Sequence, residues 1–332
     1  MVKLGEYMSS SEPEWEEIKI RAYQHNGWFT PTFINEACSK ITTLYLKEEL
    51  LQAWTSKYKL PEAPAEQKNV GIVMAGNIPL VGFHDFLSVF ITGHRQTVKL
   101  SAKDNVLLKH LINKLTQWNE SFGDYAAVEE ILKGCDAYIA TGSNNSSRYF
   151  EQYFARFPHI IRKNRTSCAI ISGRETGTEL DKLSDDIHLY FGLGCRNVSK
   201  IFVPKDYDFI PLLKSFDRYD YFADHHKYKN NYDYQLSIIL LNNIYYMTNG
   251  STLLTQNEGL FSPISHLFFE YYEDLNKVLE KLQQNEGLQC IIGGGHTGFG
   301  EAQNPGLLAY ADGVDTLQFL QSIQPSTKAL LI

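Results

Sequence analysis

Hydrophobic and polar residues follow two periods along the chain, one typical of amphipathic helices and one typical of short buried strands. Apolar residues recur at helical spacing in residues 13–25 and about 34–59. A connector broken by prolines follows at 60–67, and strands then alternate with helices. The pattern predicts strands at 69–74, 96–100, 135–141 and 167–172, with helices at 79–93, 104–118 and 144–157.

A second series of strands and helices continues to the end of the chain. It predicts helices at 180–191, 232–247, 272–284 and about 314–322, strands at 200–204, 288–293 and 307–310, and an extended segment at 260–269. Strands separated by helices favour parallel sheets, which bind ligands at the carboxyl ends of their strands. We therefore expect an α/β fold with two parallel-sheet domains, over residues 1–175 and 176–310, and a terminal strand and helix over 311–332.

Composition narrows the class of protein. Hydrophobic residues make up 43% and charged residues 21%, and the formal net charge of -7 argues against nucleic-acid or anionic-membrane partners. Polar residues interrupt the longest apolar stretches, at 78–93 and 236–247, so no membrane span is expected. The N-terminus has no apolar segment of a secretory signal, and the five cysteines contain no C-x-x-C pair, so we expect a cytoplasmic protein. His225 and His226 lack a third ligand at metal spacing, so no metal site is predicted.

Cys195 is the first candidate for chemistry. It follows Gly192 and Gly194 in a loop between a predicted helix and a predicted strand, and Arg196 comes next. Glycines permit close approach of a substrate, and a neighbouring cation favours a thiolate. A buried structural cysteine is the alternative, and it is the interpretation we give to the other four cysteines.

Three further segments end strands of the first series. Asn77 could donate its amide to an oxyanion or could simply cap the following helix. Lys99 could reach a ribose or phosphate or could be a solvated lysine. Gly142 and Ser143 open a helix whose N-terminus could attract a phosphate, or Ser143 could be an ordinary cap. No G-x-G-x-x-G fingerprint is present.

Taken together and in order, these segments resemble the aldehyde-dehydrogenase superfamily. The run GNIPL is similar to its W-N-F-P-L, VKLSAKD to its K-P-S-E, ATGS to its F-T-G-S, GLGC to its G-Q-x-C, and GLFSPI to its E-x-F-G-P-V. The runs WFTPTF and YFGLGCRNVSK are similar to its acyl-CoA/acyl-protein reductase branch, the reductase component of the bacterial luminescence fatty-acid reductase complex.

The resemblance implies an aldehyde-dehydrogenase-like fold of two Rossmann-like domains, the first binding NADPH and the second carrying the nucleophile. It implies that Cys195 is the nucleophile and that Asn77 stabilises the oxyanion. The cofactor-binding residues that it implies are Met74, Ala75, Gly76, Lys99, Ser101, Ala102, Gly142, Ser143 and Glu258.

Four departures from the superfamily pattern refine this expectation. The general-base glutamate of E-L-G-G-K-S has no counterpart in residues 160–167, which favours reduction of a thioester over its hydrolysis. Ala102 replaces the acid that contacts the ribose, which favours NADPH over NADH. Glu258 lies one position before the expected glutamate, and the connector 60–67 is short for an oligomerisation hairpin.

The implied activity is reduction of a fatty acyl thioester, from acyl-CoA or from an acyl carrier or acylated partner protein, to an aldehyde. NAD(P)-dependent aldehyde oxidation and a catalytically idle scaffold for an acyl-transferring partner are the alternatives. The donor, the acyl-chain length and the oligomeric state, including a possible homo-oligomer, stay open.

Overall fold

The chain folds into two compact units in the computed structural model, which describes residues 1–60, 64 and 66–323. The first unit comprises Met1–Lys163 and the described part of Pro305–Ile332, and the second comprises Asn164–Asn304. Parts of the predicted connector 60–67 and the last residues of the predicted tail lie outside the described residues.

The first unit is built on a five-stranded parallel sheet in the order β3-β2-β1-β4-β5. Its strands are β1 (Asn69–Val73), β2 (Arg95–Lys99), β3 (Ala126–Val128), β4 (Ala137–Thr141) and β5 (His159–Arg162). Parallel strands are usually covered by helices on both faces, so their sequences are short apolar runs.

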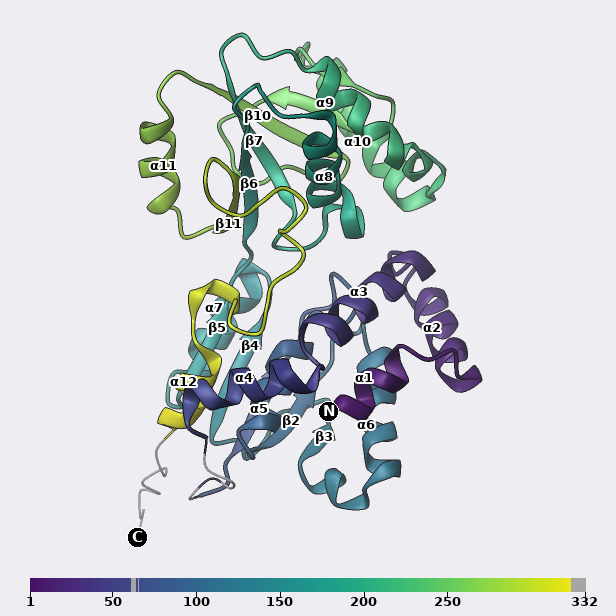
Figure 1. The fold of residues 1–332 in the computed structure, drawn as a ribbon, viewed down its shortest axis with the longest axis vertical. Coiled ribbons are helices and arrows are strands. Elements are labelled where there is room, and N and C mark those ends of the chain that lie inside the picture. The colour runs from purple at the N-terminus through teal and green to yellow at the C-terminus, as the bar shows by residue number, and fades with distance from the viewer. Residues whose placement is uncertain (61–63, 65, 324–332) are drawn as a thin grey trace. The chain divides into compact units, whose positions relative to one another are not determined.

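Helices cover both faces of this sheet (Figure 1). The helices are α1 (Val2–Met8), α2 (Pro13–His25), α3 (Pro31–Leu44), α4 (Glu48–Tyr58), α5 (Phe83–Ile91), α6 (Leu107–Trp118), α7 (Asn144–Phe154) and α12 (Thr316–Ser322), with short 3-10 turns at Glu120–Asp124 and Ala311–Gly313. One apolar cluster joins most of them to β1, and α7 stacks Phe154 on Tyr138 of β4, with ring centroids 4.0 Å apart.

The second unit contains a six-stranded sheet in the order β11-β6-β7-β10-β9-β8, parallel except for β8. Its strands are β6 (Thr166–Ile170), β7 (Val198–Pro204), β8 (Met247–Thr248), β9 (Leu253–Gln256), β10 (His266–Tyr272) and β11 (Leu288–Gly293). Its helices are α8 (Gly177–His188), α9 (Ile210–Ser215), α10 (His226–Leu241) and α11 (Leu275–Gln283), with 3-10 turns at Leu189–Gly192 and Phe216–Asp224. In Figure 1, α11 lies on one face of the sheet, and α8, α9 and α10 lie on the other.

The predicted α/β class with two parallel sheets is confirmed, but the chain divides earlier than predicted. Strand β6, which the sequence placed in the first domain, pairs with β7 and β11 of the second unit. The predicted strand at 307–310 is a turn whose Leu307 and Tyr310 are buried in the first unit's core. The boundaries predicted at 175/176 and 310/311 are therefore wrong. Residues 164–175 belong to the second unit, and residues 305–310 belong to the first.

Two predicted helices also differ from the observed ones. The helix predicted over 34–59 is two helices, because Leu46 between them is buried against Gly5 of α1. The helix predicted to open at Pro79 begins at Phe83, because Leu80 takes a left-handed conformation with φ of 57°.

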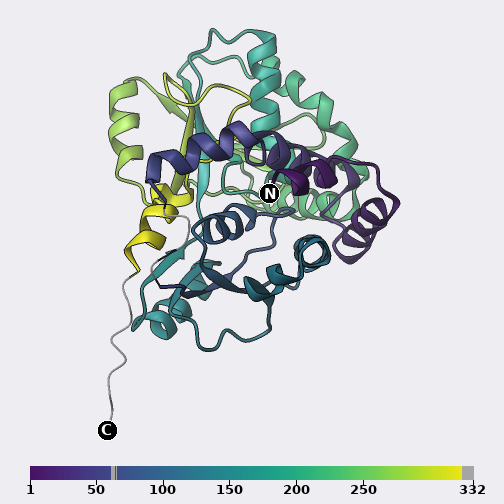
Figure 2. The ribbon, with the colours of Figure 1, turned by 60° about the horizontal axis from the view of Figure 1, so that its bottom comes forward.

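The C-terminal helix is joined to the first unit by polar contacts. Trp54 donates to Tyr310 Oη at 2.8 Å, and Tyr58 donates to Asp315 Oδ2 at 2.7 Å. Figure 2 shows α12, in yellow, beside the end of α4. A buried ion pair between β5 and α5 contacts the same helix: the Arg162 guanidinium contacts Asp85 and donates to Thr316 Oγ1 of α12 at 2.9 Å.

We predict that Arg162→Met lowers the free energy of unfolding of the first unit by about 3–5 kcal/mol, because it leaves Asp85 buried without its cation. All four tryptophans lie in this unit, so their fluorescence during urea unfolding reports on it alone. Lys163→Met is the matched control, since Lys163 pairs with Glu151 at 2.9 Å on the surface, where pairs contribute about 0–1 kcal/mol. An Arg162→Met variant as stable as the control would contradict this prediction.

Candidate functional site

Cys195 lies in a tightly turned loop between α8 and β7. Tyr190, Phe191 and Gly192 all have positive φ, at 56°, 56° and 72°. Such a conformation costs free energy in Tyr and Phe and persists only where the surrounding structure fixes it. The loop leaves Cys195 half-buried, whereas Tyr190 and Phe191 are buried.

Asn197 fixes this loop. Its side chain is 2% exposed, its Oδ1 accepts from the Gly194 backbone N–H at 2.8 Å, and its Nδ2 donates to the carbonyls of Leu189 at 2.8 Å and Asp186 at 3.1 Å. One buried amide therefore ties the end of α8 to the residue before Cys195. Sequence reasoning did not single out Asn197, because an Asn after a loop cysteine has no pattern that distinguishes it from a surface residue.

A second thiol lies close to the Cys195 backbone. Ser167 Oγ donates to the Cys195 carbonyl at 3.1 Å and lies 3.0 Å from Cys290 Sγ. Either the Ser167 hydroxyl or the Cys290 thiol can donate in this second contact. Burial raises the pKa of Cys290, although Ser167 and Arg196 act in the opposite direction.

The remaining cysteines have the structural role that the sequence predicted. Cys38, Cys135 and Cys168 are buried, and burial raises the pKa of Cys38 and of Cys168 to about 12. Cys290 was grouped with them but is only half-buried. It is therefore the cysteine against which a role for Cys195 is best tested.

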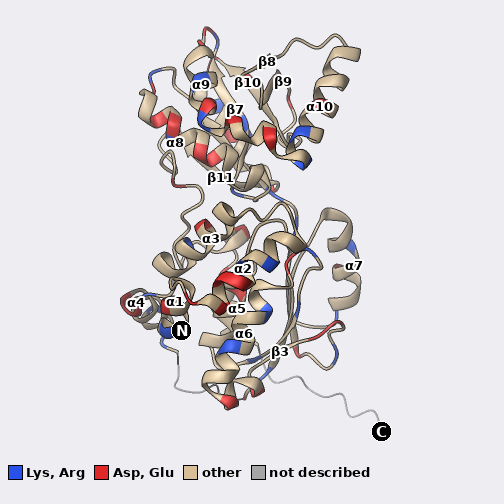
Figure 3. Ribbon diagram, turned by 90° about the vertical axis from the view of Figure 1, so that its right-hand side faces the viewer, with Lys and Arg blue, Asp and Glu red and all other residues tan. Residues whose placement is uncertain are grey.

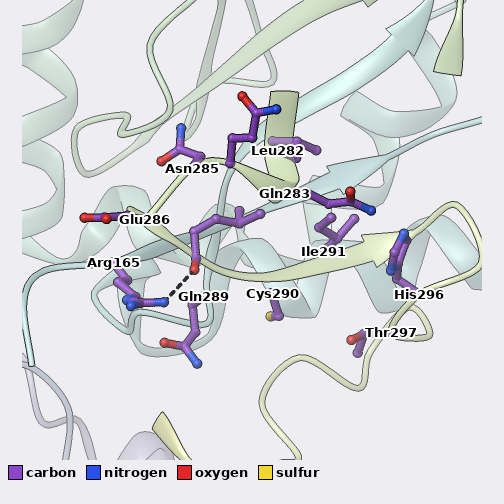
Figure 4. A pocket seen from close by; sticks show the side chains of 12 residues that line it. Arg165, Leu282, Gln283, Asn285, Glu286, Gln289, Cys290, Ile291, His296 and Thr297 are labelled. Carbon is purple, nitrogen blue, oxygen red and sulfur yellow. Dashed lines mark hydrogen bonds between the residues drawn. The ribbon is translucent and has the colours of Figure 1, made fainter. Parts of the chain in front are cut away.

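Cys290 lines a pocket of about 460 Å³ within the second unit. The pocket lies between β11, the end of α11 and the turn that follows β11, and Figure 4 shows Cys290, His296 and Thr297 along its wall. Arg165 also lines it and donates to the Leu288 carbonyl at 3.1 Å. The pocket is of mixed polarity, because its lining includes both amide side chains and the apolar residues Leu282, Leu288 and Ile291.

The glycine-rich turn after β11 is anchored to α8. Asp186 is 1% exposed, and its two carboxylate oxygens accept from the backbone N–H groups of Gly300 at 2.7 Å and Ala302 at 3.1 Å. The same helix thus holds both the Cys195 loop, through its last carbonyls, and the glycine-rich turn.

In the first unit, the predicted residues lie at one edge of the sheet. Val73 pairs with Lys99 on β2 and with Ala140 on β4, so the segments that follow β1, β2 and β4 leave the sheet at the same level. The chain order reverses between β1 and β4, and this is the position at which open parallel sheets bind ligands. Lys99 is exposed there, Met74 and Gly76 are buried, and Ala75 is half-buried.

Asn77 does not cap the following helix. It lies half-buried in the bend after β1, and the N-cap of α5 is Gly82. The capping alternative for Asn77 is therefore wrong. Gly76 is required at its position, because a Cβ there would lie 2.6 Å from Ser101 Oγ.

The turn after β2 carries Ser101, Ala102 and Lys103. Ala102 and Lys103 are exposed, and Ser101 is half-buried against Gly76. His25 Nε2 donates to the Ala102 carbonyl at 2.7 Å, so an imidazole lies beside the position where the superfamily has an acid. The sequence did not indicate His25, which is 77 residues away along the chain.

In the turn between β4 and α7, Ser143 is the ordinary helix cap that the sequence offered as an alternative to a phosphate site. Ser143 is the N-cap of α7, and its Oγ accepts from the Ser146 N–H at 3.2 Å. Gly142 is half-buried, and a Cβ on it would lie 2.9 Å from Phe150. Capping by Ser143 leaves the other N–H groups of the first helical turn to interact with an anion.

Glu258 has an exposed side chain on the loop after β9. The loop itself is held by Lys200, a lysine 1% exposed, whose Nζ donates to the carbonyls of Asn257 and Glu258, both at 2.9 Å, and pairs with Glu270 at 2.5 Å.

The three cations of residues 160–167 have different surroundings: Arg162 is buried, Arg165 is half-buried and Lys163 is exposed. Arg162 is 4% exposed and bound to Asp85 and Thr316, Lys163 pairs with Glu151, and Arg165 bonds the Leu288 carbonyl. Because Arg162 is buried and already paired with Asp85, its charge is not available to a ligand or to a thiolate.

No protein-family model and no curated protein sequence matches this chain. Solved structures do resemble it in fold. The aldehyde dehydrogenase 21 of Physcomitrella patens, solved with the reaction product succinate, has a TM-score of 0.66 at 9% identity, over 88% of this chain and 72% of that one. The gamma-glutamyl-gamma-aminobutyraldehyde dehydrogenase of Burkholderia cenocepacia has a TM-score of 0.63 at 12% identity, over 88% and 69%. An indole-3-acetaldehyde dehydrogenase of P. syringae, solved with NAD+, has a TM-score of 0.62 at 11% identity, over 88% and 70%.

These likenesses establish the fold: the chain has the α/β fold of aldehyde dehydrogenases, with parallel-sheet Rossmann-like units. Among the described residues, no helix combines the length and apolar character needed to cross a bilayer. The same residues contain no cluster of three or more His, Cys, Asp or Glu side chains suited to a metal ion. Figure 3 shows acidic and basic positions interspersed along the helices of each unit.

Proposed function

We propose that this protein reduces a fatty acyl thioester to an aldehyde with NADPH, through a thioester on Cys195. The acyl donor is acyl-CoA, an acyl carrier or an acylated partner protein. The observation that carries the proposal is the Cys195 loop, in which left-handed residues and the buried Asn197 amide hold a half-exposed cysteine at the start of β7. In the described residues none of the five cysteines forms a disulfide, which suits a reducing, cytoplasmic compartment.

The edge of the first sheet fits a dinucleotide. Gly76 leaves room that a Cβ would close, Lys99 is exposed beside it, and α7 opens at the reversal of strand order. In this proposal Met74, Ala75 and Gly76 support the nicotinamide half, Lys99, Ser101 and Ala102 contact the ribose, and Gly142 and Ser143 receive the phosphates. Glu258 is proposed as a further contact. The NAD+ bound in the P. syringae enzyme supports a nicotinamide cofactor.

The chain's own groups perform the acyl transfer. The Cys195 thiolate attacks the thioester carbonyl, a C–S bond forms, and the carbonyl electrons move to oxygen. The Cys195 backbone N–H is proposed to donate to that oxyanion, and the resemblance to aldehyde dehydrogenases implies the Asn77 amide as a second donor. The oxyanion collapses as the carrier thiolate leaves and takes up a proton. NADPH held by the residues named above would supply the hydride for reduction of the enzyme thioester to aldehyde, with Cys195 leaving as thiolate.

The direction of the reaction is argued from residues 160–167. Hydrolysis of an enzyme thioester needs a base that activates water, and this segment contains no acid. Its buried Arg162 is already paired with Asp85. The fold alone is equally compatible with aldehyde oxidation, so the missing acid is the reason for preferring reduction. A catalytically idle scaffold would not need the constrained Cys195 loop.

We predict that labelled acyl-CoA, without cofactor, leaves a thioester on Cys195, and that Cys195→Ala abolishes both this label and aldehyde formation. Cys290→Ala is the matched control, because Cys290 is half-buried and contacts the same Ser167 hydroxyl. It should retain the label. Mass spectrometry of tryptic peptides locates the acyl group, and label on Cys290 in the wild-type chain would overturn the assignment of the nucleophile.

We predict that Asn77→Ala slows acylation of Cys195 by about 10²–10³, the usual loss for one oxyanion donor. Because Gly82 and not Asn77 caps α5, the free energy of unfolding should change little. Acylation rates and urea unfolding of the same variant test this. A loss of stability with an unchanged rate would show a structural role instead.

We predict that the wild-type chain prefers NADPH over NADH and that Ala102→Glu shifts the preference toward NADH. A carboxylate at this exposed position would repel a 2′-phosphate and accept from a 2′-hydroxyl. The measurement is kcat/KM with each cofactor, and Ala102→Gln controls for side-chain size. Equal use of both cofactors by the wild-type chain would remove the basis of this assignment.

A further inference from the structure

The mechanism above leaves one buried acid of the first unit unused. Asp104 follows the turn after β2 and is 7% exposed. Its Oδ2 accepts from the Leu80 backbone N–H at 2.8 Å, and its Oδ1 has no hydrogen-bond partner among the described residues. Burying a carboxylate oxygen without a hydrogen-bond partner costs free energy, so a buried acid of this kind calls for an explanation.

The bond from Leu80 is made at the point of greatest strain in the Asn77 turn. Leu80 has φ of 57°, a conformation that a branched apolar residue rarely adopts. Its side chain is 3% exposed, and its carbonyl accepts from Phe83 at 2.9 Å to begin α5. Leu80 is three residues after Asn77, so its conformation determines the path by which the chain leaves Asn77 and enters the helix.

The turn that carries Asp104 is itself anchored. The Asp104 N–H donates to the Ser101 carbonyl at 3.0 Å, and His25 and Asn26 donate to the carbonyls of Ala102 at 2.7 Å and Lys103 at 3.2 Å. Ser101 also packs against Gly76, the residue before Asn77. The two turns thus touch on both sides of Asn77, through Gly76 and through Leu80.

We propose that Asp104 is a positioning residue, whose carboxylate holds Leu80 in its left-handed conformation and thereby aims the Asn77 amide at the oxyanion. This inference rests on the proposed function of Asn77. The bond between Leu80 and Asp104 also joins the turn after β2, which is assigned to the ribose, with the turn after β1, which is assigned to the oxyanion. The two halves of the site in the first unit then depend on one hydrogen bond.

The hydrogen bond from Leu80 to Asp104 depends on pH, because the Asp104 carboxyl can ionise. Burial raises the pKa of Asp104 to about 7, against the opposing effects of the Leu80 hydrogen bond and of His25. The groups that face it are His25 from α2 and Cys38 from α3, with Lys103 on its own turn. An ionised carboxylate accepts more strongly than a neutral one, so the bond to Leu80 weakens as pH falls through about 7.

The raised pKa of Asp104 affects the stability of the fold in the opposite sense to the strength of the Leu80 hydrogen bond. Between the ordinary Asp pKa of 3.8 and about 7, the folded chain binds more protons at this carboxyl than the unfolded chain. The contribution of Asp104 to the free energy of unfolding therefore falls as pH rises across this window. A group kept only for stability would not be expected to act in this direction.

The experiment measures the rate at which labelled acyl-CoA acylates Cys195, without cofactor, in the full-length chain. The variants are Asp104→Ala, Asp104→Asn, Asn77→Ala and the double variant Asn77→Ala/Asp104→Ala. The matched control is Asp136→Asn, because Asp136 Oδ2 accepts from the Asn69 N–H at 2.8 Å at the opposite end of β1. The control should acylate at the wild-type rate.

We expect Asp104→Ala to slow acylation by about 10- to 100-fold, as a misaligned catalytic group does, and to have no further effect once Asn77 is removed. The ratio of the wild-type rate to the Asp104→Asn rate should rise with pH through about 7, and using this ratio cancels any pH dependence that the two chains share. If Asp104→Ala does not fold, the near-isosteric Asp104→Asn and its pH ratio decide the question.

Two results would overturn the inference and leave the proposed function intact. One is an Asp104→Ala variant that acylates as fast as the wild-type chain while Asn77→Ala is slow. The other is an equal slowing by Asp104→Ala with and without Asn77, which shows a general structural role. A wild-type chain that is never acylated at Cys195 would instead remove the proposed function, and this inference with it.

Discussion

The parallel pairing of β1 with β2 on one side and β4 on the other is the constraint on which the candidate cofactor site depends. Because Val73 is in register with both Lys99 and Ala140, three loops leave the sheet at one level. One of these loops carries Asn77, one carries Ala102, and one opens α7. Sheet register therefore brings together segments that are far apart in the sequence, and the contacts of Gly76 and Asp104 join the first two loops.

The second unit places its reactive residue by a different means. Cys195 is on a loop, and the loop is made rigid by the buried Asn197 amide and by strained residues at the end of α8. Helix α8 also anchors the glycine-rich turn through Asp186. In both units a buried polar side chain, rather than regular secondary structure, fixes the backbone next to the candidate catalytic group.

Sequence patterns predicted most strands and the α/β class, because buried strands and amphipathic helices have strong periodicities. They did not predict the unit to which β6 belongs, since strand pairing is non-local and Thr166–Ile170 is equally apolar in either sheet. Motif order identified Cys195 and Asn77 as candidates. It missed Asn197, Asp104 and the ion pair of Arg162, because each acts through partners distant in sequence that only the fold brings close.

In the proposed mechanism the acyl-enzyme reacts with a hydride and not with water. The most direct measurement forms the labelled Cys195 thioester, removes the excess acyl-CoA, and follows the decay of the label with and without NADPH. We expect slow loss without cofactor, because residues 160–167 contain no acid to activate water, and rapid release of aldehyde when NADPH is added. Rapid decay to free fatty acid without cofactor would contradict it and would place the enzyme among aldehyde-oxidising dehydrogenases.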